Sequence, residues 1–273
     1  MSNISLTASM RSNLLSLQNT QGLMDLTQER LSTGKKVNSA IDNPSSYYTA
    51  QALSNRASDL SALLDSMGQA IQTIKAADEG IEAITTFAQQ AKAVAQSAAD
   101  SSDASERAAY MDQFNEIMDQ INAVAEDSSY KGINLLGGTD NKLTVKFSEK
   151  ENSKLVIDGV DATTGEDGLD IATAADWDST VANITTAIGE VDAAIAKLRN
   201  WSSEFGNNYS IVQSREEFTE NLINVLTEGA DKLTLADMNE ESANMLALQT
   251  RQQLAINSLS LASQASQSVL KLF

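Results

Sequence analysis

The chain has 273 residues, of which 42% are hydrophobic, enough for the packed core of one large domain or two small ones. It contains no Cys and no His, which excludes disulfides, thiolate metal sites and the histidine-activated nucleophiles of common hydrolases. A net charge of −18 argues against partners made of nucleic acid or anionic lipid. We therefore expect no catalytic, cofactor-binding or metal site, no nucleic-acid binding and no membrane insertion.

The first element is predicted to be an amphipathic helix over residues 4–32. Its larger apolar residues follow alternating steps of three and four, with Gln21 and Gln28 at the remaining positions of the stripe: Met10, Leu14, Leu17, Met24 and Leu31. Turn-forming residues then end the helix at Gly34, and the only proline, Pro44, biases the residue before it away from helical angles. Residues 33–46 are therefore predicted to be a connector. The start of the chain shows no cleavable signal peptide.

The clearest pattern is an unbroken heptad repeat, typical of a long coiled-coil-like helix. Its seam changes from large residues to alanines along the chain, through Leu60, Leu63, Met67, Ala70, Ile74, Ala77, Ile81, Ile84, Ala88, Ala91, Ala95 and Ala98. A shorter helix with the same spacing follows, with Tyr110, Phe114, Ile117, Ile121 and Val124. The connection between the two is short, which predicts an antiparallel pair.

A change of period from seven to two, between residues 141 and 160, predicts a β-hairpin made of KLTVKF and KLVIDGV. The stretch after it is acidic, and it places Asp158, Asp161, Glu166 and Asp167 close together. The spacing of a calcium-binding EF-hand loop is not met, so a solvated surface loop is favoured over a calcium site.

A heptad pattern returns from Val181 to Leu198, shifts phase, and resumes at Ile211, Phe218, Leu222 and Val225, which predicts a second long helix with a stutter. The segment 228–238 breaks the pattern and is predicted to be a second connector. A final helix is expected from residue 239 to Phe273.

The predicted fold is mainly α: a long antiparallel coiled-coil-like bundle with a small β-hairpin, and paired terminal helices in a separate layer. The terminal helices (1–32 and 239–273) are expected to order only on assembly, because polar connectors (33–46 and 228–238) separate them from the bundle. The bundle is assigned to 47–138 and 176–227, and the hairpin with its acidic loop to 139–175.

Four segments, in order along the chain, resemble segments of bacterial flagellins: LSTGKKVNSAIDNPSS, QSAAD, YKGINLLGG and LALQTRQQLAINSLSLASQASQSVLKLF. The chain is similar to the short members of that family over essentially its whole length. One departure is Asn43-Pro44, which stands where flagellins often have an acidic and a small residue, so the connector is expected to be stiffer.

The resemblance implies a structural subunit that assembles through its terminal helices into the flagellar filament used for swimming. The residues expected to carry polymerisation are Met10, Leu14, Leu17, Met24, Leu31, Leu248, Leu254, Leu259, Leu261, Val269, Leu270 and Phe273. It further implies type III export of the unfolded chain, an export chaperone on the last helix, and an extracellular location. Sibling flagellins, hook-associated proteins and cap proteins are the other partners it implies.

Flagellins detected by the innate flagellin receptor carry an Arg and a Leu on the long helix and a Glu on the next. The corresponding positions here hold Gln89, Ala93 and Gln113. We expect weak or absent recognition.

Three alternatives are weighed. A hook–filament junction protein shares flagellin-like ends but forms only a thin ring. A flagellin that displays a metalloprotease is excluded, because an H-E-x-x-H zinc site needs histidine. A secreted coiled-coil effector would fold and be secreted without its last residues, whereas a flagellin is expected to stop polymerising without residues 270–273.

Overall fold

The computed structural model describes residues 8–150 and 152–270. The chain divides into two compact units: a terminal unit, Met1–Arg56 with Val225–Phe273, and a central unit, Ala57–Asn224. Within the described residues, no helix is both long and apolar enough to cross a membrane.

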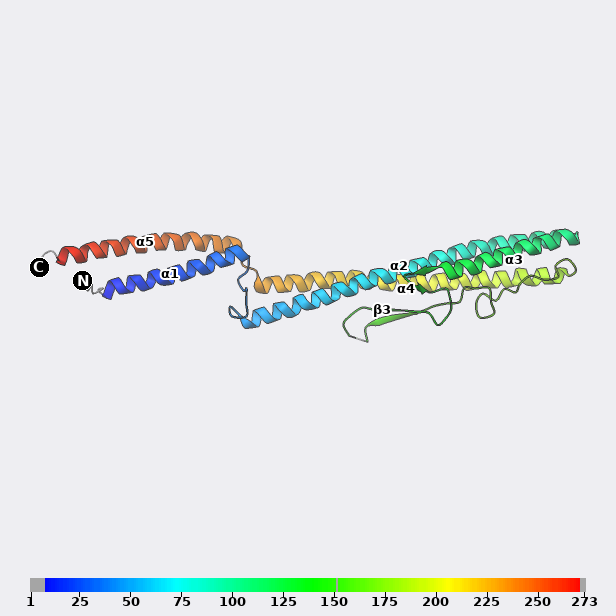
Figure 1. The fold of residues 1–273 in the computed structure, drawn as a ribbon, viewed down its shortest axis with the longest axis horizontal. Coiled ribbons are helices and arrows are strands. Elements are labelled where there is room, and N and C mark those ends of the chain that lie inside the picture. The colour runs from blue at the N-terminus through cyan, green and yellow to red at the C-terminus, as the bar shows by residue number, and fades with distance from the viewer. Residues whose placement is uncertain (1–7, 151, 271–273) are drawn as a thin grey trace. The chain divides into compact units, whose positions relative to one another are not determined.

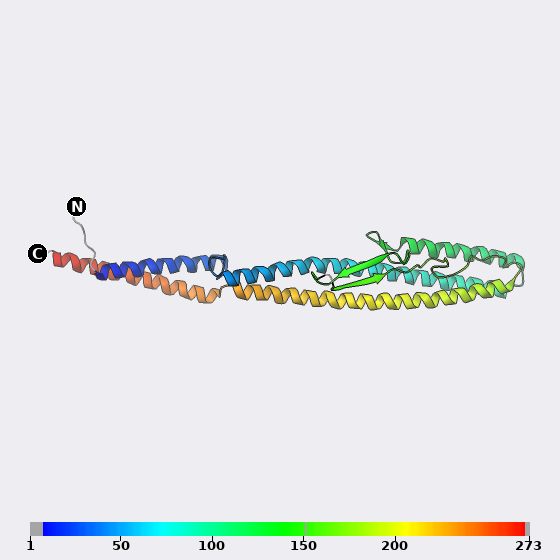
Figure 2. The same ribbon diagram turned by 90° about the horizontal axis from the view of Figure 1, so that it is seen from below.

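In the terminal unit, helix α1 (Ala8–Thr33) packs antiparallel to helix α5 (Met238–Leu270), as Figures 1 and 2 show. The carboxylate of Asp237 caps α5 by accepting a hydrogen bond of 2.9 Å from the backbone N–H of Asn239. Glu240 and Glu241 in the first turn complement the positive end of the helix dipole. Local sequence therefore defines where α5 begins.

The two connectors are shorter than predicted, and they are hydrogen-bonded to each other. Gly34 takes the left-handed conformation (φ 71°) directly after α1, and its carbonyl accepts from the N–H of Ala236 at 3.0 Å. The N–H of Lys36 donates to the carbonyl of Thr234 at 2.7 Å, and Lys35 pairs with Leu235 in an antiparallel bridge. We call residues 34–37 and 234–236 the joint.

The prediction of a connector over 228–238 is wrong for residues 228–234, which continue helix α4 (Val181–Thr234). The segment loses the heptad spacing but keeps good helix formers, and helical backbone hydrogen bonds do not depend on an apolar stripe. Its one glycine, Gly229, weakens a helix by only about 1 kcal/mol.

Helix α2 (Pro44–Asp100) confirms the long heptad. Its first turn is capped by the side chain of Asn43, which accepts from the N–H of Ser46 at 3.1 Å, with Pro44 in the first helical position. Eleven of the twelve predicted seam residues are buried, and Leu63 is half-buried. The seam alanines at the end of this stripe, Ala88, Ala91, Ala95 and Ala98, have no exposed surface, so a neighbouring segment of the chain approaches closely there.

Helix α3 (Ala104–Asp127) follows a short turn and is capped by Asp103, whose carboxylate accepts from the N–H of Ser105 at 2.8 Å. It runs beside α2 and α4 within the central unit (Figures 1 and 2). Phe114 and Ile121 are buried as expected, together with Met118 and Ala125.

The predicted β-hairpin is confirmed as antiparallel strands β3 (Lys142–Lys146) and β4 (Lys154–Asp158). Leu143 pairs with Ile157, and both are buried. A second, two-residue pair, β1 (Ser129–Tyr130) with β2 (Ile133–Asn134), was not predicted, because such short strands leave no alternation to detect.

The prediction of a solvated loop after the hairpin is wrong for its apolar residues. Glu166 and Asp167 are exposed as expected, but Leu169, Ile171 and Trp177 are buried in the core. Three polar side chains of helices α3 and α4 hold the loop: Arg107 bonds the carbonyl of Trp177, Asn115 bonds both backbone groups of Ala174, and Lys197 bonds the carbonyl of Gly168. Composition alone did not show these long-range partners.

The stripe predicted for the second part of α4 is wrong for three of its four residues; the fourth, Leu222, is half-buried. Ile211, Phe218 and Val225 are exposed, and the buried residues lie one position further along, at Val212, Thr219 and Leu226. Both stripes have heptad spacing, so spacing alone does not distinguish them. Packing against neighbouring helices buries the stripe that contains Thr219.

Candidate functional site

The terminal helix pair is joined by a thin seam. On α1 the buried residues are Met10, Thr20 and Thr27, and Leu17, Met24 and Leu31 on the same side of the helix are half-buried. On α5 the buried residues are Glu241 and Leu248. A seam that includes two threonines and a glutamate buries little apolar area, so it contributes modestly to the stability of the pair.

Polar contacts set the register of this seam. The Nη1 of Arg30 donates to Oε1 of Glu241 at 2.8 Å, and the Glu241 side chain is only 9% exposed. Among the described side-chain atoms, Arg30 Nε is buried without a hydrogen-bond partner. Further along the pair, Gln252 donates to Gln21 at 2.7 Å. Because ion pairs and amide pairs need defined partners, they align the two helices more specifically than leucines would.

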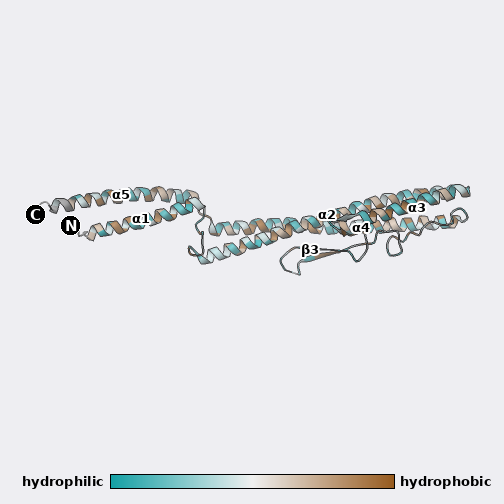
Figure 3. Cartoon of the chain, viewed as in Figure 1, coloured by the Kyte–Doolittle hydropathy of each residue, from teal (hydrophilic) through white to brown (hydrophobic). Residues whose placement is uncertain are grey.

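Each terminal helix carries a second apolar face, directed away from the seam. On α1, Leu15, Leu23 and Leu26 are exposed and share one side of the helix by their spacing. On α5, Leu246, Leu254 and Leu261 recur every seven or eight residues, and all three are about two-thirds exposed. The hydropathy colouring in Figure 3 shows apolar positions along both helices. We call these six leucines the outer leucines.

The structure separates the residues predicted to carry polymerisation into two groups. Met10, Leu17, Met24, Leu31, Leu248 and Leu259 are buried or half-buried in the described pair, whereas Leu14, Leu254 and Leu261 are exposed. The side chains of Val269 and Leu270, and all of Phe273, lie outside the described residues.

Four outer leucines, Leu15, Leu23, Leu26 and Leu246, were missed by sequence reasoning. The prediction sought one heptad stripe on each helix, and residues of a second stripe on the opposite side do not fit that register. The signal that could have found them is an excess of leucines over what a single seam can hold.

The three positions compared with receptor contacts, Gln89 and Ala93 on α2 and Gln113 on α3, are all exposed. They belong to the central unit. Their side chains are therefore accessible in the subunit.

Within the described residues, no group of three or more acidic side chains is arranged to hold a metal ion. Asp161, in the acidic loop, instead accepts hydrogen bonds from the N–H and hydroxyl of Thr163 at 2.9 and 2.6 Å.

Two family models match the chain: the bacterial flagellin N-terminal helical region over residues 4–141, and the bacterial flagellin C-terminal helical region over residues 188–273. Flagellin FljM of Caulobacter vibrioides is 32% identical, with 95% of each chain covered. The flagellin of Brucella melitensis biotype 1 is 29% identical over 95% of each chain. A crystal structure of Bacillus cereus flagellin has 15% identity and a TM-score of 0.48, covering 56% of this chain and 88% of that one.

Proposed function

Since this chain belongs to the bacterial flagellin family, we propose that it polymerises through the outer leucines of its terminal helix pair. As a flagellin it is a structural subunit of the extracellular flagellar filament, which serves motility, and its main partner is itself. The proposal concerns which surface makes the contacts between subunits.

The observation that carries the proposal is the excess of exposed leucine in the terminal unit. Exposed leucines on isolated helices are unfavourable in water, and a contiguous apolar face is typical of an interaction surface. In a homopolymer the outer leucines of one pair meet those of the next, so copies of one face cover each other. The thin seam supports the further proposal that the helix pair is only partly ordered in the monomer and becomes fully ordered on assembly.

Electron microscopy of the concentrated, purified protein tests the self-assembly on which this proposal rests. We expect long filaments, seeded by filament fragments, and no filaments from a variant that lacks residues 270–273. A hook–filament junction protein would give no long filaments at any concentration. That outcome would overturn the assignment of this chain as a filament subunit.

We also propose that the outer leucines of α5 bind an export chaperone before secretion by the type III apparatus. The same exposed face would otherwise associate prematurely. A 1:1 complex with the cognate chaperone on size-exclusion chromatography, lost after deletion of residues 246–273, is the expected result. A complex unaffected by the deletion would place the chaperone elsewhere. Sibling flagellins, hook-associated proteins and cap proteins are the other proposed partners.

Weak recognition by the innate flagellin receptor is a third proposal. Gln89 and Gln113 lack the charges of the Arg and Glu that recognised flagellins carry at these positions, and Ala93 lacks the apolar bulk of their Leu. All three positions are exposed. Introducing Gln89→Arg, Ala93→Leu and Gln113→Glu together should raise reporter activation by monomer. Equal and strong activation by the unchanged protein would refute this reading.

A further inference from the structure

Helix α4 carries a continuous face without charge along the central unit. The residues of this face follow one another at steps of three or four, which places them on one side of the helix. The first part is small: Ala182, Thr185, Gly189, Ala193 and Ala196. The second part mixes polar and large apolar residues: Asn200, Ser203, Asn207, Ile211, Ser214, Phe218 and Asn221. All twelve residues are exposed, and we call them the uncharged face.

The absence of charge from this face is selective. In residues 181–224 of α4, all of which the structure describes, the exposed charged residues lie outside it: Asp192, Arg199, Glu204, Arg215, Glu217 and Glu220. Helix surfaces directed to solvent ordinarily carry charged residues. The central unit is moreover strongly charged, with 29 acidic and 11 basic residues. A long exposed face without charge is therefore typical of the core of an interface, from which charged residues are depleted.

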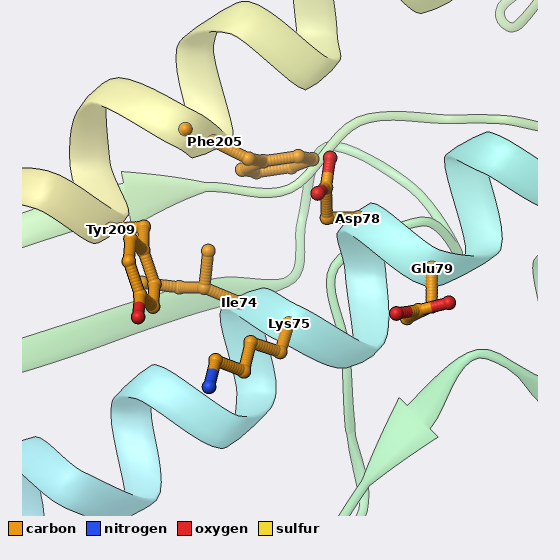
Figure 4. A pocket seen from close by; sticks show the side chains of 7 residues that line it. Ile74, Lys75, Asp78, Glu79, Phe205 and Tyr209 are labelled. Atoms are coloured by element: carbon orange, nitrogen blue, oxygen red, sulfur yellow. The ribbon is translucent and has the colours of Figure 1, made fainter.

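The uncharged face is turned away from helix α2. Figure 4 shows the side of α4 that meets α2, where Phe205 and Tyr209 line a pocket together with Ile74. Helical spacing places the uncharged face on the opposite side of α4 from Phe205 and Tyr209. Ile211 and Phe218, one heptad apart on the uncharged face, remain 45% and 57% exposed. Large apolar residues on such a face are unfavourable in water until a partner covers them.

The charge of the chain indicates which partner covers this face. A cationic partner would gain affinity from acidic side chains on its docking face, and here acidic side chains are left out. A partner that is itself acidic is repelled by such side chains, so it approaches best where charge is excluded. A second copy of this chain is such a partner, because its net charge is −18 and flagellins assemble with themselves.

We infer that a second copy of the chain covers the uncharged face of α4 in the filament. The small residues of its first part permit close approach of the neighbour, and Ile211 and Phe218 of its second part contribute buried apolar area. Subunits of an open helical polymer meet through different surfaces, so the face meets another part of the neighbour rather than itself. The inference rests on the filament of the proposed function and adds a contact of the central unit to those of the outer leucines.

Thiol labelling tests the contact directly, because the sequence contains no native cysteine. Ala196→Cys places a thiol in the uncharged face, and Gln213→Cys is the matched control at an exposed position of α4 outside that face. Each variant is co-assembled as a minor fraction with wild-type protein and treated with a maleimide. We expect Ala196→Cys to react about tenfold or more slowly in filaments than in monomer, because reaction requires access to the thiol, and Gln213→Cys to keep most of its rate.

Lysine at the same two positions supplies an independent readout. Ala196→Lys and Gln213→Lys both make the net charge less negative, so general repulsion between copies falls equally in the two variants. Alanine, glutamine and lysine are all good helix formers, so monomer helicity should be kept. We expect Ala196→Lys to raise the critical concentration for assembly about tenfold or more, since the contact would bury an unpaired charge, and Gln213→Lys to leave it unchanged.

The outcomes separate the two proposals. Filaments in which Ala196→Cys is protected no better than Gln213→Cys overturn the contact alone, since the face is then open to an occupant other than a second copy. Assembly of Ala196→Lys at the same critical concentration as Gln213→Lys overturns it as well. Wild-type protein that forms no filaments overturns the proposed function, and this contact with it.

Discussion

Replacing Leu254 by serine should weaken assembly far more than it weakens the subunit. Leu254 is 64% exposed, so the folded pair buries only about a third of it, and the monomer should lose about 0.5–1 kcal/mol. Burying the remaining two-thirds in a filament would contribute about 1–2 kcal/mol per subunit. The critical concentration should therefore rise about fivefold to thirtyfold.

The assay is the protein concentration left in the supernatant after seeded assembly and pelleting. Leu248→Ser is the matched control, since Leu248 is buried in the seam of the same helix. This control should lower the helix content of the monomer, measured by circular dichroism, whereas Leu254→Ser should not. An unchanged critical concentration for Leu254→Ser would refute the argument that the outer leucines form the subunit interface.

Three further outcomes are expected. Arg30→Ala leaves the nearly buried carboxylate of Glu241 without its partner and should lower the free energy of urea unfolding by on the order of 2 kcal/mol. The loss is smaller than for a fully buried pair because Arg30 is a third exposed. Glu241→Ala should lower it less, and a larger loss for Glu241→Ala than for Arg30→Ala would contradict the geometry. Ala95→Leu should lower the free energy of unfolding by about 1–3 kcal/mol, because it overpacks a fully buried position. Ala93→Leu, at an exposed position, should change it by under about 0.5 kcal/mol. Equal effects of the two substitutions would refute the close packing around Ala95. Backbone hydrogen bonds, first from the N–H of Ser39 and then from that of Asn38, lower the pKa of Asp42, so its stabilisation of the turn at residues 38–43 is present above the usual aspartate pKa and is lost as pH falls below it. Amide shifts of the turn followed by NMR should therefore hold at pH 5 and change only in stronger acid, and Asp42→Asn should abolish that change.

The candidate assembly surface was only partly predictable. Leu254 and Leu261 were expected from spacing and are exposed on the outer side of α5. Met10 and Leu248 were expected for the same reason but lie in the seam. Spacing places residues on one side of a helix, but it does not say whether that side meets the partner helix of the same chain or a second copy.

The receptor positions and Ile41 illustrate a different limit. Gln89, Ala93 and Gln113 could be located only through the family resemblance, because exposed residues outside an apolar seam leave no periodic signal. Ile41 is visible in the sequence as an isoleucine among turn residues, but its 93% exposure and its rigid support appear only in the folded chain.

The heptad of α2 was determined by sequence alone, because twelve consecutive seam positions permit one register and no competing stripe exists. The capped starts of α2 and α5 are likewise local, since each depends on one side chain and the next turn of backbone. Tertiary structure decided the buried face of α4, where Val212 and Thr219 prevailed over Ile211 and Phe218. It also decided the burial of Trp177 in a loop that composition predicted to be solvated, since Arg107 and Phe114, 70 and 63 residues earlier in the chain, provide its partners. Periodicity is a property of one segment, whereas the choice between two stripes, or between loop and core, depends on what the rest of the chain places opposite.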